Sequence, residues 1–166
     1  MIKGRCDFKD LQRFQEKMEV FTEKQREKFI NAVAKELAAR LIARVAKRTP
    51  VKTGALRRGW TAKTHEEAVS DSGAGKNPIA YANSLPIVRK GNVYEIEVIN
   101  PVKYGSYVEY GHRQEAGRYV HAIRKRLKKS WVEGRFFLTK SKNELENEAP
   151  EVIEKKLAKE LKKVLG

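Results

Sequence analysis

The side chains that could perform acid–base, nucleophilic or metal chemistry are few and scattered along the chain. Glu109 is a candidate acid, but a catalytic carboxylate pair needs a second carboxylate at a defined spacing, and none is recognisable. The sequence therefore predicts no enzyme, no cofactor and no metal site. The other reactive side chains lack the spacing of zinc ligands or of a nucleophile with its base; they are Cys6, His65, Ser84, Ser106, His112 and His121.

Positive charge is the more prominent chemistry of this sequence. The chain has 36 Lys and Arg against 21 Asp and Glu, a formal net charge of +15, which attracts polyanions or acidic protein surfaces. Seven basic residues face only Glu115 between positions 113 and 129, a local net charge of +6. The candidate interface residues of this basic insert (112–134) are Arg113, Arg124, Lys125, Arg126, Lys128, Lys129 and Trp131.

Apolar residues recur within the basic insert at helical spacing. Val120, Ile123, Leu127 and Trp131 follow each other at i, i+3, i+7 and i+11, which indicates a basic amphipathic helix or an extended arm. Such a segment can bind a neighbouring protein, DNA or a membrane surface, or it can be a solvated surface helix packed on its own domain.

Long helices must position these residues. Thr22 and Gln25 form the pattern of a capping box, and the apolar residues that follow predict a spine helix of about 40 Å that ends before Pro50. Its apolar face is Phe29 or Ile30, Val33, Leu37, Leu41 and Val45. Upstream, Asp7 can cap an amphipathic helix that reaches Val20, so residues 1–21 are expected to hold an N-terminal helix.

A small sheet is expected after the spine helix. Thr53 can cap a single helical turn, and Gly59 then leads into a strand from Trp60 to Glu66. Residues 70–79 read as a flexible loop. Two further strands, 85–89 and 93–99, form a hairpin around Lys90-Gly91-Asn92, so the antiparallel sheet has three or four strands.

The last part of the chain returns to helix. Tyr104 to Tyr110 predicts a short helix that Gly111 stops. Its three tyrosines could stack on bases, but packing against the hairpin is favoured. Helices occupy residues 135–166, where Pro150 starts or kinks the last one. Helices, strands and helices in this order predict a single α+β domain over 1–166, with a long N-terminal helix packed on the small sheet.

Three motifs in this order resemble the tail-completion or head–tail joining proteins of tailed phages, the gene product ten family of lambdoid siphophages. The first is Pro-Val-Lys-Thr-Gly-Ala-Leu-Arg at 50–57, and the second is Tyr-Gly-Ser-Tyr-Val-Glu-Tyr-Gly at 104–111. The third is Gly-Arg-Phe-Phe-Leu at 134–138. Gly-His-Arg at 111–113 and Trp-Val-Glu-Gly-Arg at 131–135 are similar to the branch found in Gram-positive prophages.

The resemblance implies a structural virion protein of the phage neck, assembled in the host cytoplasm. Such a protein forms a homo-oligomeric ring, a hexamer or a dodecamer, between the head connector or adaptor and the tail terminator or tail-tube proteins. DNA passes through this assembly, so no specific DNA binding is expected, and a protein partner is favoured for the basic insert. Arg57, Arg58 and Glu109 are further candidate interface residues, with Glu109 expected to pair with Arg57 within one subunit or between two subunits.

The composition indicates the cellular compartment in which the chain is made, and it allows one alternative function. A single cysteine excludes an internal disulfide framework, and no apolar run approaches the roughly 18 residues of a membrane span, so a protein made in the cytoplasm is expected and no membrane partner. The net charge keeps a basic nucleic-acid-binding protein as the alternative, although no helix-turn-helix, zinc-finger or RNA-binding strand motif is legible.

Overall fold

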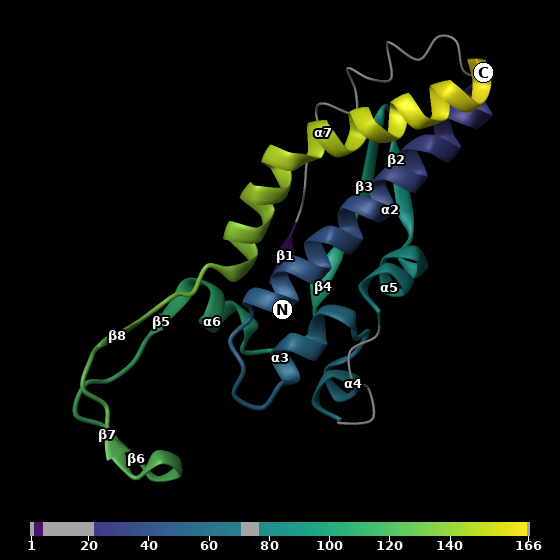
Figure 1. Ribbon diagram of the computed structural model, residues 1–166. Helices are drawn as coiled ribbons and strands as arrows, with labels where there is room; N and C mark the ends of the chain where they lie inside the picture. The colour runs from purple at the N-terminus through teal and green to yellow at the C-terminus, as the bar shows by residue number, and fades with distance from the viewer. Residues whose placement is uncertain (1, 5–21, 71–76, 166) are drawn as a thin grey trace.

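The computed structural model describes residues 2–4, 22–70 and 77–165. Its spine is helix α2 (Glu23–Arg48), which runs through the body of the molecule (Figure 1). Thr22 and Gln25 form the predicted capping box, and the helix ends at Thr49, directly before Pro50. The predicted apolar face is confirmed, since every residue named for it is buried.

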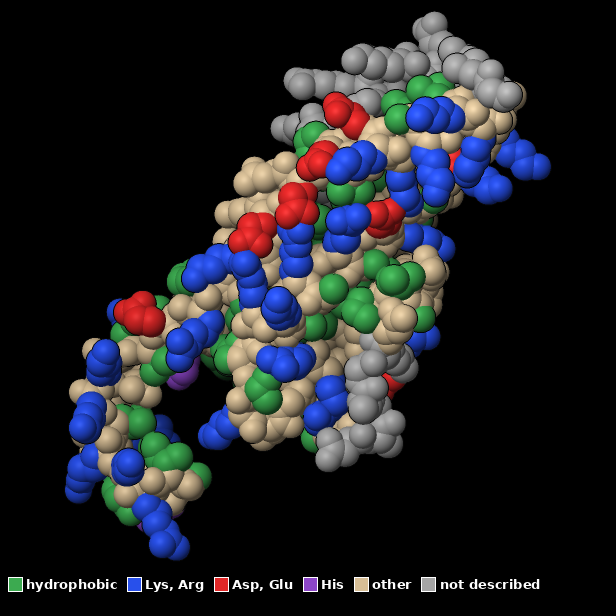
Figure 2. All heavy atoms as spheres, in the orientation of Figure 1, with side chains coloured by type: hydrophobic (Ala, Val, Ile, Leu, Met, Phe, Trp, Pro, Cys, Tyr) green, Lys and Arg blue, Asp and Glu red, His purple; other side chains and the backbone are tan. Residues whose placement is uncertain are grey.

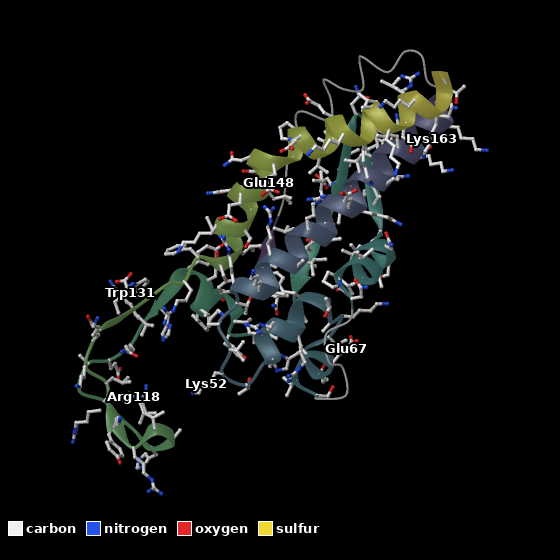
Figure 3. All side chains as sticks on the ribbon, viewed as in Figure 1. Lys52, Glu67, Arg118, Trp131, Glu148 and Lys163 are labelled. Atoms are coloured by element: carbon white, nitrogen blue, oxygen red, sulfur yellow. The ribbon has the colours of Figure 1, made fainter. Side chains whose placement is uncertain are left out.

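A second long helix, α7 (Phe137–Leu165), lies beside α2 (Figure 1). Pro150 lies inside it, so the proline kinks one helix and does not start another; Figure 3 shows Glu148 at the change of direction. Ion pairs join the two helices: Arg44 with Glu148, Arg48 with Glu144 at 2.6 Å, and Lys156 with Glu36 at 2.6 Å.

The carboxylate of Glu36 is held in its charged form at this helix contact. Partial burial opposes ionisation, but the hydrogen bonds and charges of Lys156 and Arg40 outweigh it and lower the pKa of Glu36. The two helices are therefore joined by charge pairs at the rim of their apolar contact.

The strands form antiparallel pairs. β2 (Ile87–Lys90) pairs with β3 (Val93–Ile96) around Gly91 and Asn92, and Gly91 has a φ of +61°. The predicted hairpin is thus confirmed. After one residue, β4 (Val98–Asn100) continues and pairs with the N-terminal strand β1 (Ile2–Gly4). Long helices on small antiparallel sheets confirm the α+β class.

The strand predicted for Trp60 to Glu66 is wrong. Its place is taken by the helical turns α3 (Ala55–Arg58) and η1 (Gly59–Thr61) and by the short helix α4 (His65–Val69). Thr64 caps α4 by accepting a hydrogen bond from the amide of Glu67, which fixes helix where alternation suggested strand. The cap of α3 is also not Thr53 but Gly54, whose φ of +79° is left-handed.

Some predictions lie partly or wholly outside the described residues. Of the N-terminal segment, only Ile2–Gly4 is described, and it is a strand rather than helix. The helix expected from Asp7 to Val20 and the residue Cys6 lie outside the described part, as do residues 71–76 of the expected loop. The end of that loop is helical, because Asn77 caps α5 (Pro78–Ser84).

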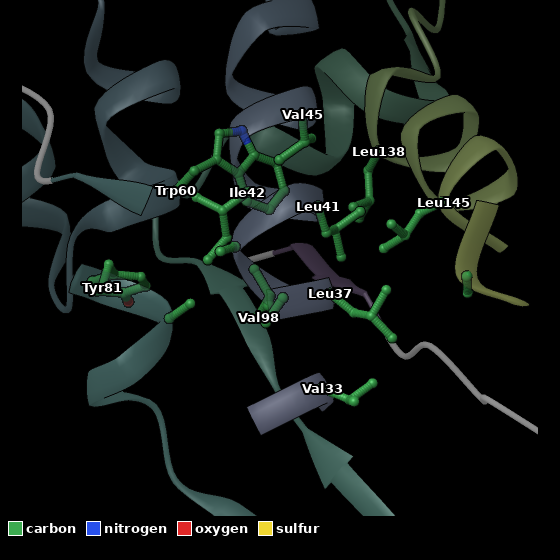
Figure 4. Close-up of a cluster of buried hydrophobic side chains, with 14 of the residues drawn as sticks. Val33, Leu37, Leu41, Ile42, Val45, Trp60, Tyr81, Val98, Leu138 and Leu145 are labelled. Atoms are coloured by element: carbon green, nitrogen blue, oxygen red, sulfur yellow. The ribbon is translucent and has the colours of Figure 1, made fainter. Parts of the chain in front are cut away.

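The core lies between α2, α5, α7, η1 and β4 (Figure 4). Trp60 is fully buried, and its ring meets that of Phe137 edge-to-face, with centroids 6.1 Å apart. No helix in the described part of the chain is long and apolar enough to cross a membrane.

Candidate assembly interface

Residues 111–134 project from the body as an arm (Figure 1). The arm follows helix α6 (Gly105–Tyr110) and leads back into α7. It contains the strands β5 (Gly111–Arg113), β6 (Tyr119–Val120), β7 (Lys125–Arg126) and β8 (Trp131–Glu133) and the turn η3 (His121–Ile123). The basic insert is therefore the extended arm, and its interpretation as an amphipathic helix is wrong.

Two short antiparallel ladders hold the arm together. β5 pairs with β8, and β6 pairs with β7. Between them the amide of Gln114 donates to the carbonyl of Ser130 at 2.9 Å, and that of Gly117 to Leu127 at 2.7 Å. No residue of the arm is buried, so the backbone bonds hold it without a hydrophobic core.

Two glycines fix the base of the arm. A Cβ on Gly111 would lie 2.4 Å from the carbonyl oxygen of Val132, and one on Gly134 would lie 2.4 Å from that of Glu109. Gly111 also has a φ of +85°. The strands that leave and re-join the body thus approach closer than any side chain allows.

We predict that Gly134→Ala loosens this base. The added methyl group must push backbone against backbone, which should lower the free energy of unfolding by about 1–3 kcal/mol. It should also expose the basic residues of the arm to faster cleavage by trypsin. Denaturant unfolding measures the free energy of unfolding, and limited proteolysis measures the rate of cleavage in the arm. A cleavage rate equal to that of the wild-type chain would contradict a fixed base.

Glu109 connects the arm base to helix α7. Its side chain is fully buried, and its carboxylate oxygens accept hydrogen bonds from the amides of Leu138 at 3.0 Å and Thr139 at 2.9 Å. The hydroxyl of Thr139 donates to it at 2.8 Å. A carboxylate in this position caps the helix and interacts with its dipole. Phe136, directly before the helix, has a φ of +52°. Its side chain has no oxygen that could cap α7, so Glu109 takes the place of a local cap.

The pairing predicted between Glu109 and Arg57 does not form within the chain. The carboxylate of Glu109 is used by α7, and the guanidinium of Arg57 donates to the carbonyl of Thr49 at 3.2 Å. Glu109 is thus inaccessible to a neighbouring molecule, whereas Arg57 is exposed.

Arg58 has a structural role in this chain. Its guanidinium donates to the carbonyls of Ala68 at 3.0 Å and Val69 at 3.2 Å, the last carbonyls of α4. A basic side chain at this helix end satisfies carbonyls that have no partner within the helix. Arg58 therefore ties α3 to α4.

The first motif is held by buried polar side chains that sequence reasoning did not single out. Thr49 donates to the carbonyl of Val45 at 2.6 Å and accepts from the indole nitrogen of Trp60 at 2.8 Å. Asn100 donates to the carbonyl of Leu56 at 2.8 Å and accepts from the amide of Val102. The only signal for Asn100 in the sequence is its place before Pro101 at the end of a strand.

The tyrosines of α6 and its cap are exposed rather than packed on the hairpin. Tyr104, Tyr107 and Tyr110 are 41%, 58% and 53% exposed, so their prediction as core residues is wrong. Tyr104 lies between two hollows of 620 and 550 Å³. Both are bordered by Thr53, and the second follows the first motif from Pro50 to Gly54.

Further aromatic side chains are exposed where the arm joins the body. Trp131 lies in β8 and Phe136 lies directly before α7, and both are at least two-fifths exposed. Tyr110 precedes the first strand of the arm. Exposed tyrosine and tryptophan together with arginine are typical of the residues that dominate protein interfaces. We call Tyr110, Trp131 and Phe136 the base aromatics.

Lys and Arg side chains gather over the arm (Figure 2). They come from both halves of the ribbon, the half that leaves the body and the half that returns to it. Arg126 donates to the carbonyl of Gly117 at 2.8 Å, and Arg118 lies 4.0 Å from Glu115. Among the described residues, no side-chain hydrogen bond or ion pair holds the other five, which are Arg113, Arg124, Lys125, Lys128 and Lys129.

Within the residues that the structure describes, no three His, Cys, Asp or Glu side chains are grouped closely enough to hold a metal ion. The features that stand out are instead a basic arm, exposed aromatic rings and hollows beside a glycine turn. Together they define a small α+β protein that presents surfaces for contact with other macromolecules.

Comparison with known families agrees with this class. The model of the HK97-gp10-like family, described as "Bacteriophage HK97-gp10, putative tail-component", matches residues 12–111. The chain belongs to this family of phage tail components. The matched region runs from before α2 to the first residue of the arm and includes the motifs at 50–57 and 104–111. No curated protein and no solved structure matches the chain.

Proposed function

We propose that the chain is a ring-forming subunit of the phage neck, a head–tail connector or tail-completion protein that joins the capsid connector to the tail. The observation that carries this proposal is the arm, a projection with a fixed base, no buried residue of its own and aromatic rings exposed where it begins. Its exposed surface is suited to contact with a neighbouring molecule rather than to packing on its own domain.

A closed ring needs two different surfaces on each subunit, because each copy contacts the next through unlike faces. The base aromatics supply one candidate surface. The two hollows beside Tyr104 supply another: both are bordered by Thr53 of the first motif, one of them also by Arg58 and the other by Gly54 and Arg135. We propose that the base aromatics of one subunit pack against the next subunit, with Arg57 at the rim of the contact.

The proposed role is structural rather than enzymatic. The subunit acts through its shape and charge, and its partners are the head connector or adaptor on one side and the tail terminator or tail-tube proteins on the other. Membership in a family of phage tail components supports such partners and a place in the virion.

The oligomeric state tests this proposal. We expect hexameric or dodecameric particles of the purified chain, alone or with a tail-tube partner, in analytical ultracentrifugation. Replacing Trp131 by alanine should weaken the ring by about 2 kcal/mol per contact, roughly 30-fold in the dissociation constant, because exposed tryptophans dominate such contacts.

Ile79→Ala is the matched control, since Ile79 is an exposed apolar residue of α5. It should leave the ring unchanged. A chain that remains monomeric, and that never assembles on the phage connector or tail, would rule out the proposed role.

A further inference from the structure

We propose that the arm binds the phosphate backbone of duplex DNA without sequence specificity. This activity goes beyond the assembly role. It can be measured on the isolated protein, so the DNA-binding proposal can be refuted while the proposed ring assembly is confirmed. The sequence alone favoured a protein partner for the basic insert; the form of the arm changes that preference.

The apolar stripe that a protein groove would take does not form. In a helix, Val120, Ile123, Leu127 and Trp131 would share one face, but here the segment is a two-stranded ribbon. Three of its five cross-strand pairs place a cation beside an apolar or aromatic side chain: Arg113 with Trp131, Tyr119 with Arg126, and Val120 with Lys125. Basic side chains therefore accompany the apolar ones from Arg113 outward to the tip of the ribbon.

A second copy of the chain does not offer the acidic surface that these cations require. The segment 113–129 carries +6 of the total of +15, which leaves +9 on the rest of the chain. Within the described body, the carboxylates of α7 at Glu144, Glu146 and Glu148 also pair with cations of the same chain. A second copy as a whole therefore repels the arm, and an anionic molecule other than this chain suits it better.

Duplex DNA fits the charge and the form of the arm. Five arm cations have no partner among the described residues, and lysine and arginine that neutralise phosphates supply most of the affinity of non-specific DNA binding. A two-stranded ribbon is also narrow enough to enter the major groove. At its tip, Tyr119 and Ile123 are exposed, where they can pack on sugars or base edges.

Such binding is compatible with DNA that moves past the protein. Contacts to phosphates alone carry no sequence information, and they let a protein slide along the duplex. The arm would therefore hold DNA in position without fixing it at one site.

The test is a salt titration with a fluorescent duplex of about 30 base pairs, chosen to exceed the footprint of one arm. We expect the wild-type chain to bind at low salt, with a logarithm of the binding constant that falls linearly with the logarithm of the salt concentration. The variant Lys125→Ala/Lys128→Ala/Lys129→Ala should bind about tenfold more weakly or worse at low salt. For this variant, the slope of the logarithm of the binding constant against the logarithm of the salt concentration should be smaller in magnitude by about 2.7, because each of the three lost phosphate contacts removes about 0.9.

The triple variant leaves the bond from Arg126 to Gly117 in place, so the ribbon should keep its form. The matched control is Lys28→Ala/Lys159→Ala/Lys162→Ala, which removes the same charge from exposed positions of α2 and α7. These positions belong to the helix ends near Lys163, opposite the arm residues Arg118 and Trp131 (Figure 3).

The proposal is supported if only the arm variant loses affinity and slope. It is overturned if the wild-type chain does not bind the duplex at low salt, or if both variants weaken binding equally, since binding then follows the net charge alone. It is also overturned if the arm variant binds DNA normally but no longer assembles with tail proteins, which would assign the arm to a protein partner.

Discussion

Replacing Trp60 by alanine should lower the free energy of unfolding by about 3–5 kcal/mol, the largest effect that we expect from a single substitution in the described core. The side chain is completely buried between the end of α2 and the start of α7. Its removal leaves a cavity, ends the edge-to-face contact with Phe137, and deprives the Thr49 hydroxyl of its indole donor.

Urea denaturation measures this effect. Trp60→Phe is the matched control, because it keeps most of the apolar volume and loses the hydrogen bond to Thr49; it should cost about 1–2 kcal/mol. If Trp60→Ala changed stability by less than about 1 kcal/mol, then Trp60 would not be the residue that joins the first motif to α7.

Glu109→Ala should lower the free energy of unfolding by about 3 kcal/mol. The substitution leaves the amides of Leu138 and Thr139 and the hydroxyl of Thr139 without their acceptor. The amide of Leu138 is buried, and leaving it unsatisfied costs about 1–3 kcal/mol, whereas the groups of the exposed Thr139 can bond to water. The favourable interaction of the carboxylate with the helix dipole is lost as well. The first turn of α7 should fray, and with it the base of the arm.

Two comparisons separate the cap from a general effect of charge. Glu109→Gln should recover only part of the loss, because its amide places a donor against one of the two backbone donors. Glu133→Ala, in an exposed position of β8, should change stability by no more than about 0.5 kcal/mol. Equal stability of Glu109→Ala and the wild-type chain in thermal and urea denaturation would refute the cap.

The elements with strong local signals could be predicted from the sequence. α2 begins at a capping box and ends before Pro50. Between these two signals, apolar residues recur at helical spacing over many turns, so all three features predict the same helix. The hairpin of β2 and β3 is likewise specified by a two-residue turn at Gly91 and Asn92.

The segment after Gly59 could not be predicted correctly because tertiary contacts decide its structure. Trp60, Ala62 and Thr64 alternate as in a strand, but the pattern is short. Trp60 is instead placed in a helical turn by its contacts with Thr49 and Phe137, which are distant in sequence. Alternation over so few residues does not outweigh such packing.

The arm shows the opposite error. The spacing of Val120, Ile123, Leu127 and Trp131 fits a helix, but a helix of this length depends on packing of its apolar face. The arm projects away from the body, so that packing is absent and the ladders satisfy part of the backbone instead (Figure 1). Arg124, with a left-handed φ of +49°, ends the turn at the tip.

The sequence motifs indicated which residues belong to the candidate site, but not what each residue does in the folded chain. Glu109 and Arg58 belong to the motifs that indicated the family, yet they cap and tie helices within the chain. The exposed residues beside them, Tyr107 and Tyr110, carry the same spacing that a buried helix face would have, and sequence spacing does not distinguish the two.

The place of the protein in the particle can be determined by electron cryomicroscopy of the intact phage. We expect a closed ring of identical subunits at the junction of head and tail, into which the α+β body fits with α2 and α7 resolved as paired rods. This expectation would be contradicted by virions in which this chain is absent, or in which its density lies only at a site away from that junction.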